Sequence, residues 1–245
     1  MGFYETLSEY YDVLFPMEDD ILNFLNNELK LKKIVLDLAC GTGTYSFPLA
    51  QASFRVIGID SNSSMIEKAK RKVSNNNPSF YCQDIKSLKN LALPGLDGAF
   101  CIGNSIVHLA TKDEVYKALQ DIKTLLMPEG RVILQIVNYD RVLNKDIREL
   151  PTLSGENVTM YRRYSKSDDP KKIVFTIELA VNTSKEAGSG EFRIQESIPL
   201  LALQSKDLTG MVSDAGFKNI RLYGSYGYDR YIAEESFLAI LTASG

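Results

Sequence analysis

The chain has 245 residues, 44% of them hydrophobic and 24% charged, a mixture that can bury a sizeable core. Its formal net charge of −3 offers no basic surface for a nucleic-acid backbone, so no nucleic-acid partner is expected. Three widely spaced cysteines and a single histidine argue against a disulfide framework and a metal site, and they predict a cytoplasmic protein. No apolar run has the length needed to cross a bilayer, which argues against a membrane partner.

The first half of the chain alternates between strand and helix patterns. Residues 18–30 place four apolar side chains on one helical stripe, which predicts a first helix. The strands expected next are residues 34–39, 54–60, 80–84, 98–103 and 131–137, and helices are expected over residues 61–73 and 112–126. Thr111 and Glu114 form a capping-box pair before the second of these helices. This alternation is typical of a parallel, doubly wound sheet.

The pattern changes after residue 138. Three strand-like segments follow without helical periodicity, at residues 157–165, 172–181 and 191–201, with a turn expected at EAGSG, residues 186–190. A helix over residues 205–216 and strands over residues 218–224 and 236–243 complete the chain. The sequence therefore predicts an α/β fold: a doubly wound, Rossmann-like, seven-stranded mostly parallel sheet with a small antiparallel β insertion. Residues 1–140 and 201–245 would form the main domain, and residues 141–200 an inserted cover over the active site.

The turn after the first strand carries the strongest functional signal. VLDLACGTGTYSFPLA, residues 35–50, places Gly41 and Gly43 where the backbone of a doubly wound sheet meets its ligand. A dinucleotide site prefers a third glycine three residues further on, where this chain has Ser46. The turn therefore predicts a bound cofactor, with a dinucleotide disfavoured.

Three carboxylates sharpen this prediction, because each falls at the end of a successive strand. Asp37 would repel a pyrophosphate but attract a cation such as a sulfonium that carries an α-ammonium group. Asp60 is within reach of ribose hydroxyls, and Asp84 could accept from an adenine amine. A turn role for Asp37 and helix-start roles for Asp60 and Asp84 are the alternatives. Their joint placement favours an adenosine with a positively charged tail.

At these residues a family resemblance emerges. VLDLACGTG, VIGIDSNSSM, YCQD and the early segment EYYD resemble the motif series of the class I S-adenosylmethionine-dependent methyltransferases. The resemblance implies S-adenosylmethionine as cofactor, with S-adenosylhomocysteine as product. The cofactor-binding residues that it implies are Asp37, Ala39, Gly41 and Gly43 for the methionine part, Asp60 and Ser61 for the ribose side, Met65, Asp84 and Ile85 for the adenine, and Gly103. Tyr11, or Tyr10, would close over the carboxylate end, although both could instead form an apolar helix face.

The segment GNSIVHL, residues 103–109, gives a narrower resemblance to the glycine and sarcosine N-methyltransferases. The segment NYD, residues 138–140, is similar to the same group and implies Asn138 and Tyr139 as substrate contacts. In that group an arginine that binds the substrate carboxylate comes directly before NYD, whereas this chain has Val137. Since an aliphatic side chain cannot bind a carboxylate, the reaction class carries over better than glycine itself.

Asn104 and His108 are the candidate catalytic residues. They lie four positions apart and could share a face if the segment turns helical. An amine acceptor needs no dedicated base, so His108 is expected to orient substrate or cofactor by hydrogen bonding. An oxygen acceptor of high pKa would make His108 a candidate base instead. A purely structural histidine is the third interpretation.

The insertion and the C-terminal loop are expected to complete the substrate pocket. YGSYGYDRY, residues 223–231, offers Tyr226 and Tyr228 as a cage for a cationic amine, with a surface loop or a subunit contact as the alternatives. Arg162 and Arg163 in MYRRY could replace the missing carboxylate contact, or could lie on a solvated strand edge.

These features predict an enzyme, an S-adenosylmethionine-dependent methyltransferase that transfers a methyl group to a small molecule, at an amine nitrogen. An O- or C-methyltransferase is one alternative, and a protein that binds S-adenosylmethionine without turnover is another. A nicotinamide oxidoreductase is disfavoured by Asp37 and by the absent third glycine. The expected partner is a small-molecule substrate, and a homo-oligomer stays open.

Overall fold

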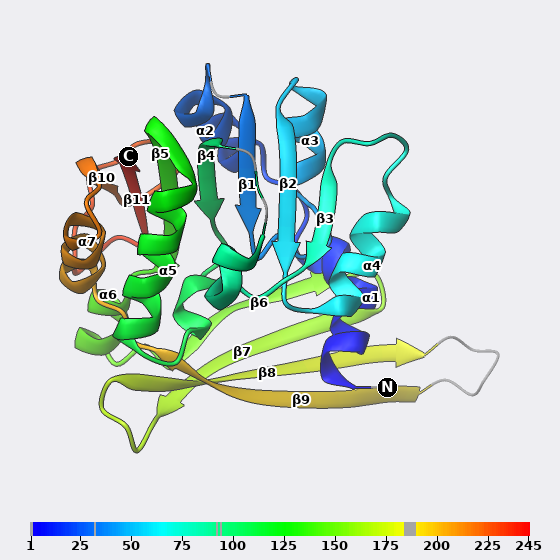
Figure 1. The fold of residues 1–245 in the computed structure, drawn as a ribbon. Helices are drawn as coiled ribbons and strands as arrows, with labels where there is room; N and C mark the ends of the chain where they lie inside the picture. The colour runs from blue at the N-terminus through cyan, green and yellow to red at the C-terminus, as the bar shows by residue number, and fades with distance from the viewer. Residues whose placement is uncertain (1, 32, 92, 94, 184–189) are drawn as a thin grey trace.

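The computed structural model describes residues 2–31, 33–91, 93, 95–183 and 190–245, and it contains a seven-stranded and a four-stranded sheet (Figure 1). Its helices are α1 (Phe3–Leu14), α2 (Asp19–Leu29), α3 (Ser46–Gln51), α4 (Ser63–Arg71), α5 (Lys112–Leu125), α6 (Tyr139–Asn144) and α7 (Ser205–Asp214), with the short 3₁₀ helices η1 (Ile85–Asn90) and η2 (Ile106–His108). The larger sheet contains β1 (Ile34–Leu38), β2 (Arg55–Asp60), β3 (Ser79–Cys82), β4 (Leu96–Cys101), β5 (Leu126–Val137), β10 (Lys218–Tyr223) and β11 (Leu238–Ser244). The smaller sheet contains β6 (Glu149–Gly155), β7 (Val158–Lys166), β8 (Lys172–Thr183) and β9 (Gly190–Leu201). The predicted α/β fold, with its mostly parallel sheet and antiparallel insertion, is confirmed.

The larger sheet has the strand order β10-β11-β5-β4-β1-β2-β3. Only β11 runs against its neighbours, pairing antiparallel with both β5 and β10. The strand order reverses between β1 and β4, and ligands of doubly wound sheets bind in the crevice at this switch point. The glycine-containing turn that follows β1 therefore lies where the fold receives a ligand.

Strand β1 is buried on both faces, which fixes the position of that turn. Val35 packs in one apolar cluster with Phe24 and Leu29 of α2. Leu36 and Leu38 point to the other face, in the large cluster that also contains the buried residues of α5. A slip of one residue would exchange these two sets of side chains, so the register of β1 is strongly specified.

Side chains cap the starts of α4 and α5, and the capping box expected at α5 is present with one difference. The Asn62 side chain accepts from the Met65 amide at 3.1 Å and caps α4. The Thr111 hydroxyl accepts from the Glu114 amide at 3.1 Å, but the Glu114 carboxylate reaches back to the amide of Ala110 rather than that of Thr111. Among the described residues, none of the helices combines the length and apolar character needed to cross a membrane.

Strand β5 begins at Leu126, although residues 127–130 were expected to separate a helix from a strand starting at Arg131. The early part is irregular: Glu129 has a left-handed backbone with φ of +63°, and the pairing with β4 shifts register between Leu96 and Gly98. Pro128 and Gly130 therefore do not separate the helix from the strand by a turn; they make the first residues of β5 irregular.

The smaller sheet follows β5 and α6 and is antiparallel throughout, in the order β6-β7-β8-β9. Three of its strands were predicted, whereas β6 was missed, because Pro151 and Gly155 interrupt its strand pattern. Pro151 is tolerated there because β6 is an edge strand. The turn predicted at EAGSG, residues 186–190, lies outside the described part of the chain except for Gly190, which begins β9. The division into domains at residues 140 and 201 stays a prediction.

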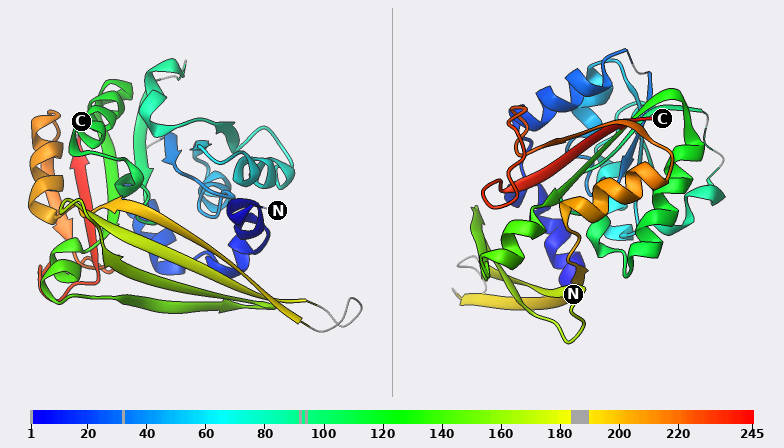
Figure 2. Two further views of the ribbon diagram at one scale, coloured as in Figure 1. Left: turned by 90° about the horizontal axis from the view of Figure 1, so that it is seen from below. Right: turned by 90° about the vertical axis from the view of Figure 1, so that its left-hand side faces the viewer.

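The smaller sheet covers the carboxyl ends of the parallel strands. The arrows of β1, β2, β3 and β4 point toward the smaller sheet (Figure 1). In the view from below, the strands of the smaller sheet lie across the front of the larger sheet (Figure 2). Helix α1 lies between the two sheets at one side, where Phe3 and Leu7 pack with Met160 and Ile177. The fold thus closes the switch-point crevice with a helix and a second sheet.

Candidate active site

The turn after β1 is held in an unusual backbone conformation. Ala39, Gly41 and Gly43 have φ values of +58°, +55° and +85°. A Cβ on Gly43 would lie 2.7 Å from Cζ of Phe80, so this glycine is required by packing. A Cβ on Gly41 would lie 3.1 Å from the ring of Tyr11 on α1. Left-handed residues other than glycine cost about 1–2 kcal/mol, so Ala39 marks strain of the kind that concentrates at ligand sites.

Asp60, at the end of β2, joins two turns around the cavity. Its Oδ2 atom accepts from the Gly41 amide at 2.9 Å, and its Oδ1 atom accepts from the Asn62 amide at 2.8 Å. Burial raises the pKa of Asp60, and the two amide hydrogen bonds oppose that effect. A carboxylate has about four acceptor positions, so Asp60 retains capacity to accept from a ligand.

Asp37 lies behind the turn rather than at its surface. Its side chain is 4% exposed, and its Oδ2 atom accepts from the Ser46 hydroxyl of α3 at 2.6 Å. Burial raises the pKa of Asp37 to about 7, the Ser46 hydrogen bond lowers it, and the charge of Asp60 raises it. Asp37 shares a strand face with Val35, which explains why it points toward α3 and is not part of the cavity wall.

Asp84, after β3, caps the 3₁₀ helix η1. Its Oδ1 atom accepts from the Lys86 amide at 2.8 Å, and the Lys86 ammonium lies 3.8 Å from Oδ2. Asp84, Ile85 and the buried Met65 of α4 all line the cavity, as does Ser61. The adenine-side residues implied by the sequence are therefore brought together.

Helix α1 is fastened to the glycine turn. The Tyr11 ring covers Gly41, and burial raises the pKa of this phenol well above its usual range. Next to it, the Asp12 carboxylate accepts from the Thr42 hydroxyl and forms an ion pair of 2.5 Å with Lys72. The Lys72 ammonium also donates to the Thr42 carbonyl at 3.2 Å. Tyr11 lines the cavity, whereas Tyr10 packs on the apolar side of the helix.

Asn104 anchors the end of β4 to the end of β5. Its backbone is left-handed, with φ of +64°. Its Nδ2 atom donates to the Tyr139 hydroxyl at 3.0 Å, and its Oδ1 atom accepts from the Val137 amide at 2.9 Å. The preceding Gly103 amide donates to Oε1 of Gln135 at 2.7 Å. Asn104 lines the cavity but is held by two protein hydrogen bonds, which is the arrangement of a positioning residue.

His108 ends η2 and also lines the cavity. Its imidazole has no hydrogen bond to any other residue in the part of the chain that the structure describes. Burial lowers the pKa of His108 below its ordinary value, so the ring is neutral at pH 7 and can accept a proton. The short helix does not include Asn104, so the shared helical face expected for this pair is absent even though both line the cavity.

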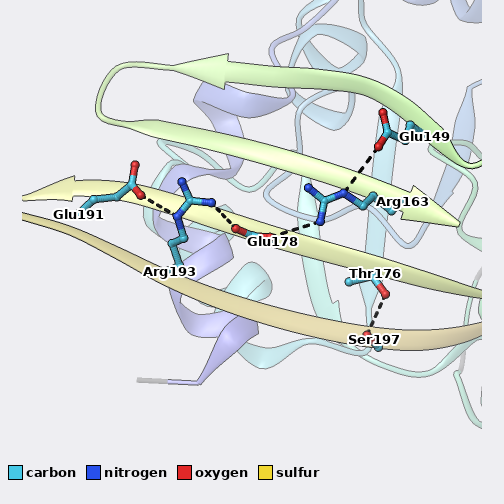
Figure 3. Close-up of polar contacts among 7 residues, drawn as sticks. All are labelled: Glu149, Arg163, Thr176, Glu178, Glu191, Arg193 and Ser197. Carbon is cyan, nitrogen blue, oxygen red and sulfur yellow. Dashed lines mark hydrogen bonds and ion pairs between the residues drawn. The ribbon is translucent and has the colours of Figure 1, made fainter. Parts of the chain in front are cut away.

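Strand β7 supplies the roof of the cavity through alternate residues. Met160, Arg162 and Tyr164 line the cavity. Arg163 points away from it and lies 3.9 Å from Glu149 and 3.6 Å from Glu178 on the outer face, where Arg193 joins the same network (Figure 3). The two arginines proposed from the sequence as alternatives are therefore separated by the strand's period of two.

The cavity has a volume of about 560 Å³, within the range of small-molecule sites. The predicted residues that line it are Tyr11, Ala39, Gly41, Asp60, Ser61, Met65, Asp84, Ile85, Gly103, Asn104 and His108. The sequence interpretation missed the contributions of Tyr4, Leu7, Phe15, Asn62, Lys86, Ser105, Leu109, Leu150, Met160, Tyr164, Phe175, Ile177 and Ile198. Within the described residues no cluster of three or more His, Cys, Asp or Glu side chains could hold a metal ion.

Asn138 and Tyr139 were expected to contact substrate, but the structure places both behind the cavity wall. Asn138 is 1% exposed; its Nδ2 atom donates to the carbonyls of Ala233 and Ser236, and its Oδ1 atom accepts from the Tyr231 hydroxyl at 2.6 Å. Tyr139 is fully buried, and it contacts the cavity wall through its bond to Asn104 and through the ring of Tyr164, at a centroid separation of 6.3 Å. NYD therefore positions the loops around the site, because its polar groups are used within the protein.

Tyr226 and Tyr228 do not form a cage at the cavity. Their rings pack on Phe24 of α2, with centroid separations of 5.4 Å and 4.7 Å. The Tyr226 hydroxyl lies 3.4 Å from Oε1 of Gln135, the acceptor of the Gly103 amide. Tyr226 is thus linked to the site through Gln135, and Tyr228 is part of an aromatic cluster with Phe24 and Tyr223.

Comparisons with known proteins agree with this geometry. A family model described as a methyltransferase domain matches residues 35–130, which include β1, β2, β3 and β4. The putative methyltransferase YqeM of Bacillus subtilis (strain 168) is 32% identical over 54% of this chain and 55% of its own length. Glycine N-methyltransferase of Mus musculus is 29% identical over 77% of this chain and 62% of its own length. The chain thus spans less than two thirds of the length of either relative.

A solved structure extends the match to the whole fold. An S-adenosylmethionine-dependent methyltransferase from Clostridium acetobutylicum ATCC 824 superposes with a TM-score of 0.80 at 18% identity, covering 98% of each chain. This likeness includes the four-stranded sheet, because nearly all of both chains is covered. Residues 35–130 thus match a methyltransferase domain, and the fold is that of an S-adenosylmethionine-dependent methyltransferase.

Proposed function

We propose that the protein transfers the methyl group of S-adenosylmethionine to the amine nitrogen of a small molecule. The observation that carries the proposal is a single cavity walled by the turn after β1, the acidic ends of β2 and β3, the polar end of β4, and the smaller sheet. Such a cavity can hold a nucleoside cofactor and a second small molecule side by side, with α1 and β7 forming part of its wall.

The residues present fit this cofactor. Gly41 keeps the backbone open beneath Tyr11, Asp60 offers acceptor positions to ribose hydroxyls, and Met65 and Ile85 offer apolar surface to an adenine. Asp60 gives this end of the cavity a negative potential, which suits a cation, and Asp37 behind the turn adds to that potential when it is ionised. The bound cofactor would supply an electrophilic methyl group, and the chain would supply orientation, exclusion of water and charge complementarity.

An amine acceptor is favoured because it needs no general base. The cavity holds one neutral imidazole, that of His108, and no neighbouring group among the described residues orients it to remove a proton. The neutral form of an amine has its own lone pair, so proximity and orientation are sufficient for transfer. The similarity to glycine N-methyltransferase supports the same reaction class. Val137 lines the cavity where that group has arginine, so glycine itself is not the proposed substrate.

The proposal is tested by measuring S-adenosylhomocysteine release from purified protein across amines, amino acids, carboxylic acids and phenols. We expect release that depends on an amine and disappears in Asp60→Ala. Release with phenols or carboxylic acids alone would move the acceptor to oxygen. Tight cofactor binding with no release from any class would leave a larger substrate or a protein that binds without turnover.

The His108→Asn variant separates the nitrogen from the oxygen acceptor. With an amine acceptor we expect the kcat of this variant to fall less than about tenfold, with the same dependence on pH as the wild type, because His108 would only orient the substrate. A general base contributes about 10²–10⁴-fold, so a loss of that size, together with loss of an acidic limb in the pH profile of kcat, would indicate an oxygen nucleophile. Steady-state kinetics between about pH 5.5 and 9 make the distinction.

A further inference from the structure

Arg162 is a cation built into the roof of the cavity. Its neighbours across the strands are Leu150 of β6 and Ile177 of β8, and both also line the cavity. Its Nε and Nη2 atoms donate to the Pro151 carbonyl at 3.2 Å and 2.7 Å. This contact fixes the plane of the guanidinium and uses two of its five N–H donors, which leaves a pre-oriented set of donors.

Within the described residues no carboxylate pairs with Arg162. This is unlike Arg163 and Arg193 on the outer face, each of which contacts Glu178 (Figure 3). The Arg162 side chain is half-buried, and desolvation lowers its pKa, an effect that only the Tyr164 phenol opposes. Isolated buried cations are costly and are usually paired, so a chain that keeps one in a cavity wall has a place for an anion there.

Tyr164 gives a second, independent indication of a ligand. Its side chain is 3% exposed and lines the cavity, yet its hydroxyl makes no hydrogen bond with any described residue. The nearby Tyr139 hydroxyl accepts from Asn104 and is not in hydrogen-bond geometry with the Tyr164 hydroxyl, although the two phenols lie close enough to influence each other's pKa. A buried hydroxyl without a partner is rare in native proteins, and a ligand oxygen would satisfy it.

The rest of the roof is apolar, formed by Leu150, Met160, Phe175, Ile177 and Ile198. We propose that the acceptor substrate carries a carboxylate on an apolar body, and that Arg162 and the Tyr164 hydroxyl bind this carboxylate. The inference rests on the proposed function, because it names the substrate class of the same cavity. An amino acid with an apolar side chain has this chemistry: the amine for the methyl group, the carboxylate for Arg162 and the side chain for the apolar wall.

Two other charged groups near the cavity bear on carboxylate binding: Lys86 could bind the carboxylate instead of Arg162, and Glu196 could repel it. Lys86 also lines the cavity, but its ammonium is held 3.8 Å from Asp84 on the cofactor side. Glu196 of β9 pairs with Ile177 and so shares the inner face of the sheet, where it raises the pKa of Tyr4. Glu196 is not part of the cavity wall, so it does not oppose a carboxylate at Arg162 directly.

The test compares binding of matched carboxylate and amide ligands by calorimetry in the presence of saturating S-adenosylhomocysteine. The pairs are benzoate, phenylacetate, 3-phenylpropionate and hexanoate, each with its primary amide. A charge-assisted hydrogen bond from arginine predicts that at least one carboxylate binds the wild type about tenfold or more tighter than its amide. In Arg162→Gln, which keeps a donor for Pro151, that ratio should fall to about one, and Tyr164→Phe should lower it several-fold.

Arg163→Gln is the matched control, because this residue lies next in sequence but on the outer face. It should keep the wild-type ratio. The ratio is measured within each variant, so a general loss of folding does not imitate the effect. The inference is overturned if no carboxylate is preferred by the wild type, if the preference survives in Arg162→Gln, or if Arg162→Gln instead loses affinity for S-adenosylhomocysteine. Failure of the wild type to bind S-adenosylhomocysteine would overturn the proposed function itself.

Discussion

Asp60→Ala is expected to weaken S-adenosylhomocysteine binding by at least about a hundredfold. The substitution removes the acceptor for the amides of Gly41 and Asn62, and with it the link between the two turns that wall the cavity. It also removes the acceptor positions that Asp60 offers to ribose hydroxyls. Hydrogen bonds to a charged group are worth about 1.5–3 kcal/mol each, so two or more lost bonds give an effect of this size. Titration calorimetry measures the change in affinity directly.

The chain offers a matched control for this variant at the opposite end of the sheet. Asp97 also accepts from two backbone amides, those of Lys33 at 3.1 Å and Ile34 at 2.9 Å, but these lie at the start of β1. Asp97→Ala should lower the free energy of unfolding while leaving cofactor affinity within about threefold of the wild type. If Asp60→Ala and Asp97→Ala have the same effect on affinity, Asp60 acts through stability alone and does not hold the cofactor.

The gathering of the glycine turn, Asp60 and Asp84 at one cavity could be predicted from the sequence because its determinants are local. Gly41 follows the buried strand β1, Asp60 is the last residue of β2, and Asp84 comes shortly after β3. Parallel strands bring their carboxyl ends to one edge of a sheet, so three short motifs are enough to gather the three turns. Asp37 shows the limit of this reasoning, because strand alternation turned it toward Ser46 and out of the cavity wall.

The role of NYD could not be predicted from the segment itself. The Asp140 carboxylate accepts from the Gln204 side chain at 3.1 Å and from the Ser205 amide at 2.9 Å, and it accepts from Tyr231 as well. These partners are more than sixty residues away in the chain. A polar triplet at the end of a central strand looks the same whether its partners are a substrate or distant loops, and only the tertiary structure decides.

The roof of the cavity shows a different limit. The alternation of Met160, Arg162 and Tyr164 was visible in the sequence, but the face that would point inward depends on where β7 packs. Strand β6, which provides the Pro151 carbonyl for Arg162, was itself missed because its proline and glycine are poor strand formers. An edge strand can form from such residues because its neighbour supplies the pairing.

Asp37→Asn is expected to stabilise the protein at high pH and to remove a pH dependence of cofactor binding. The pKa of Asp37 is raised to about 7 in the folded chain, above its value of 3.8 in the unfolded chain, mainly by burial. The wild type therefore loses stability as the pH rises from about 4 to about 7, because the unfolded chain releases this proton first. Each pKa unit is worth about 1.4 kcal/mol, so at about pH 8.5 the variant should be more stable by about 4 kcal/mol, whereas at about pH 4 the two should differ little. Urea unfolding at both pH values measures this difference.

Asp37→Asn should stabilise the folded protein but weaken its binding of a cationic ligand. A sulfonium near the turn stabilises the ionised form of Asp37, so its binding to the wild type should release a proton and strengthen between about pH 6 and pH 8. The amide side chain of the variant cannot ionise, so proton release and this pH dependence should both disappear, while affinity at about pH 8 falls. Calorimetry of S-adenosylmethionine binding in two buffers of different ionisation enthalpy counts the released protons.

Ser46→Ala removes the hydrogen bond that lowers the pKa of Asp37, so in this variant the pH dependence of binding should shift to higher pH. Parallel stability curves for wild type and Asp37→Asn would mean that Asp37 is already ionised at low pH and that its burial is compensated within the fold.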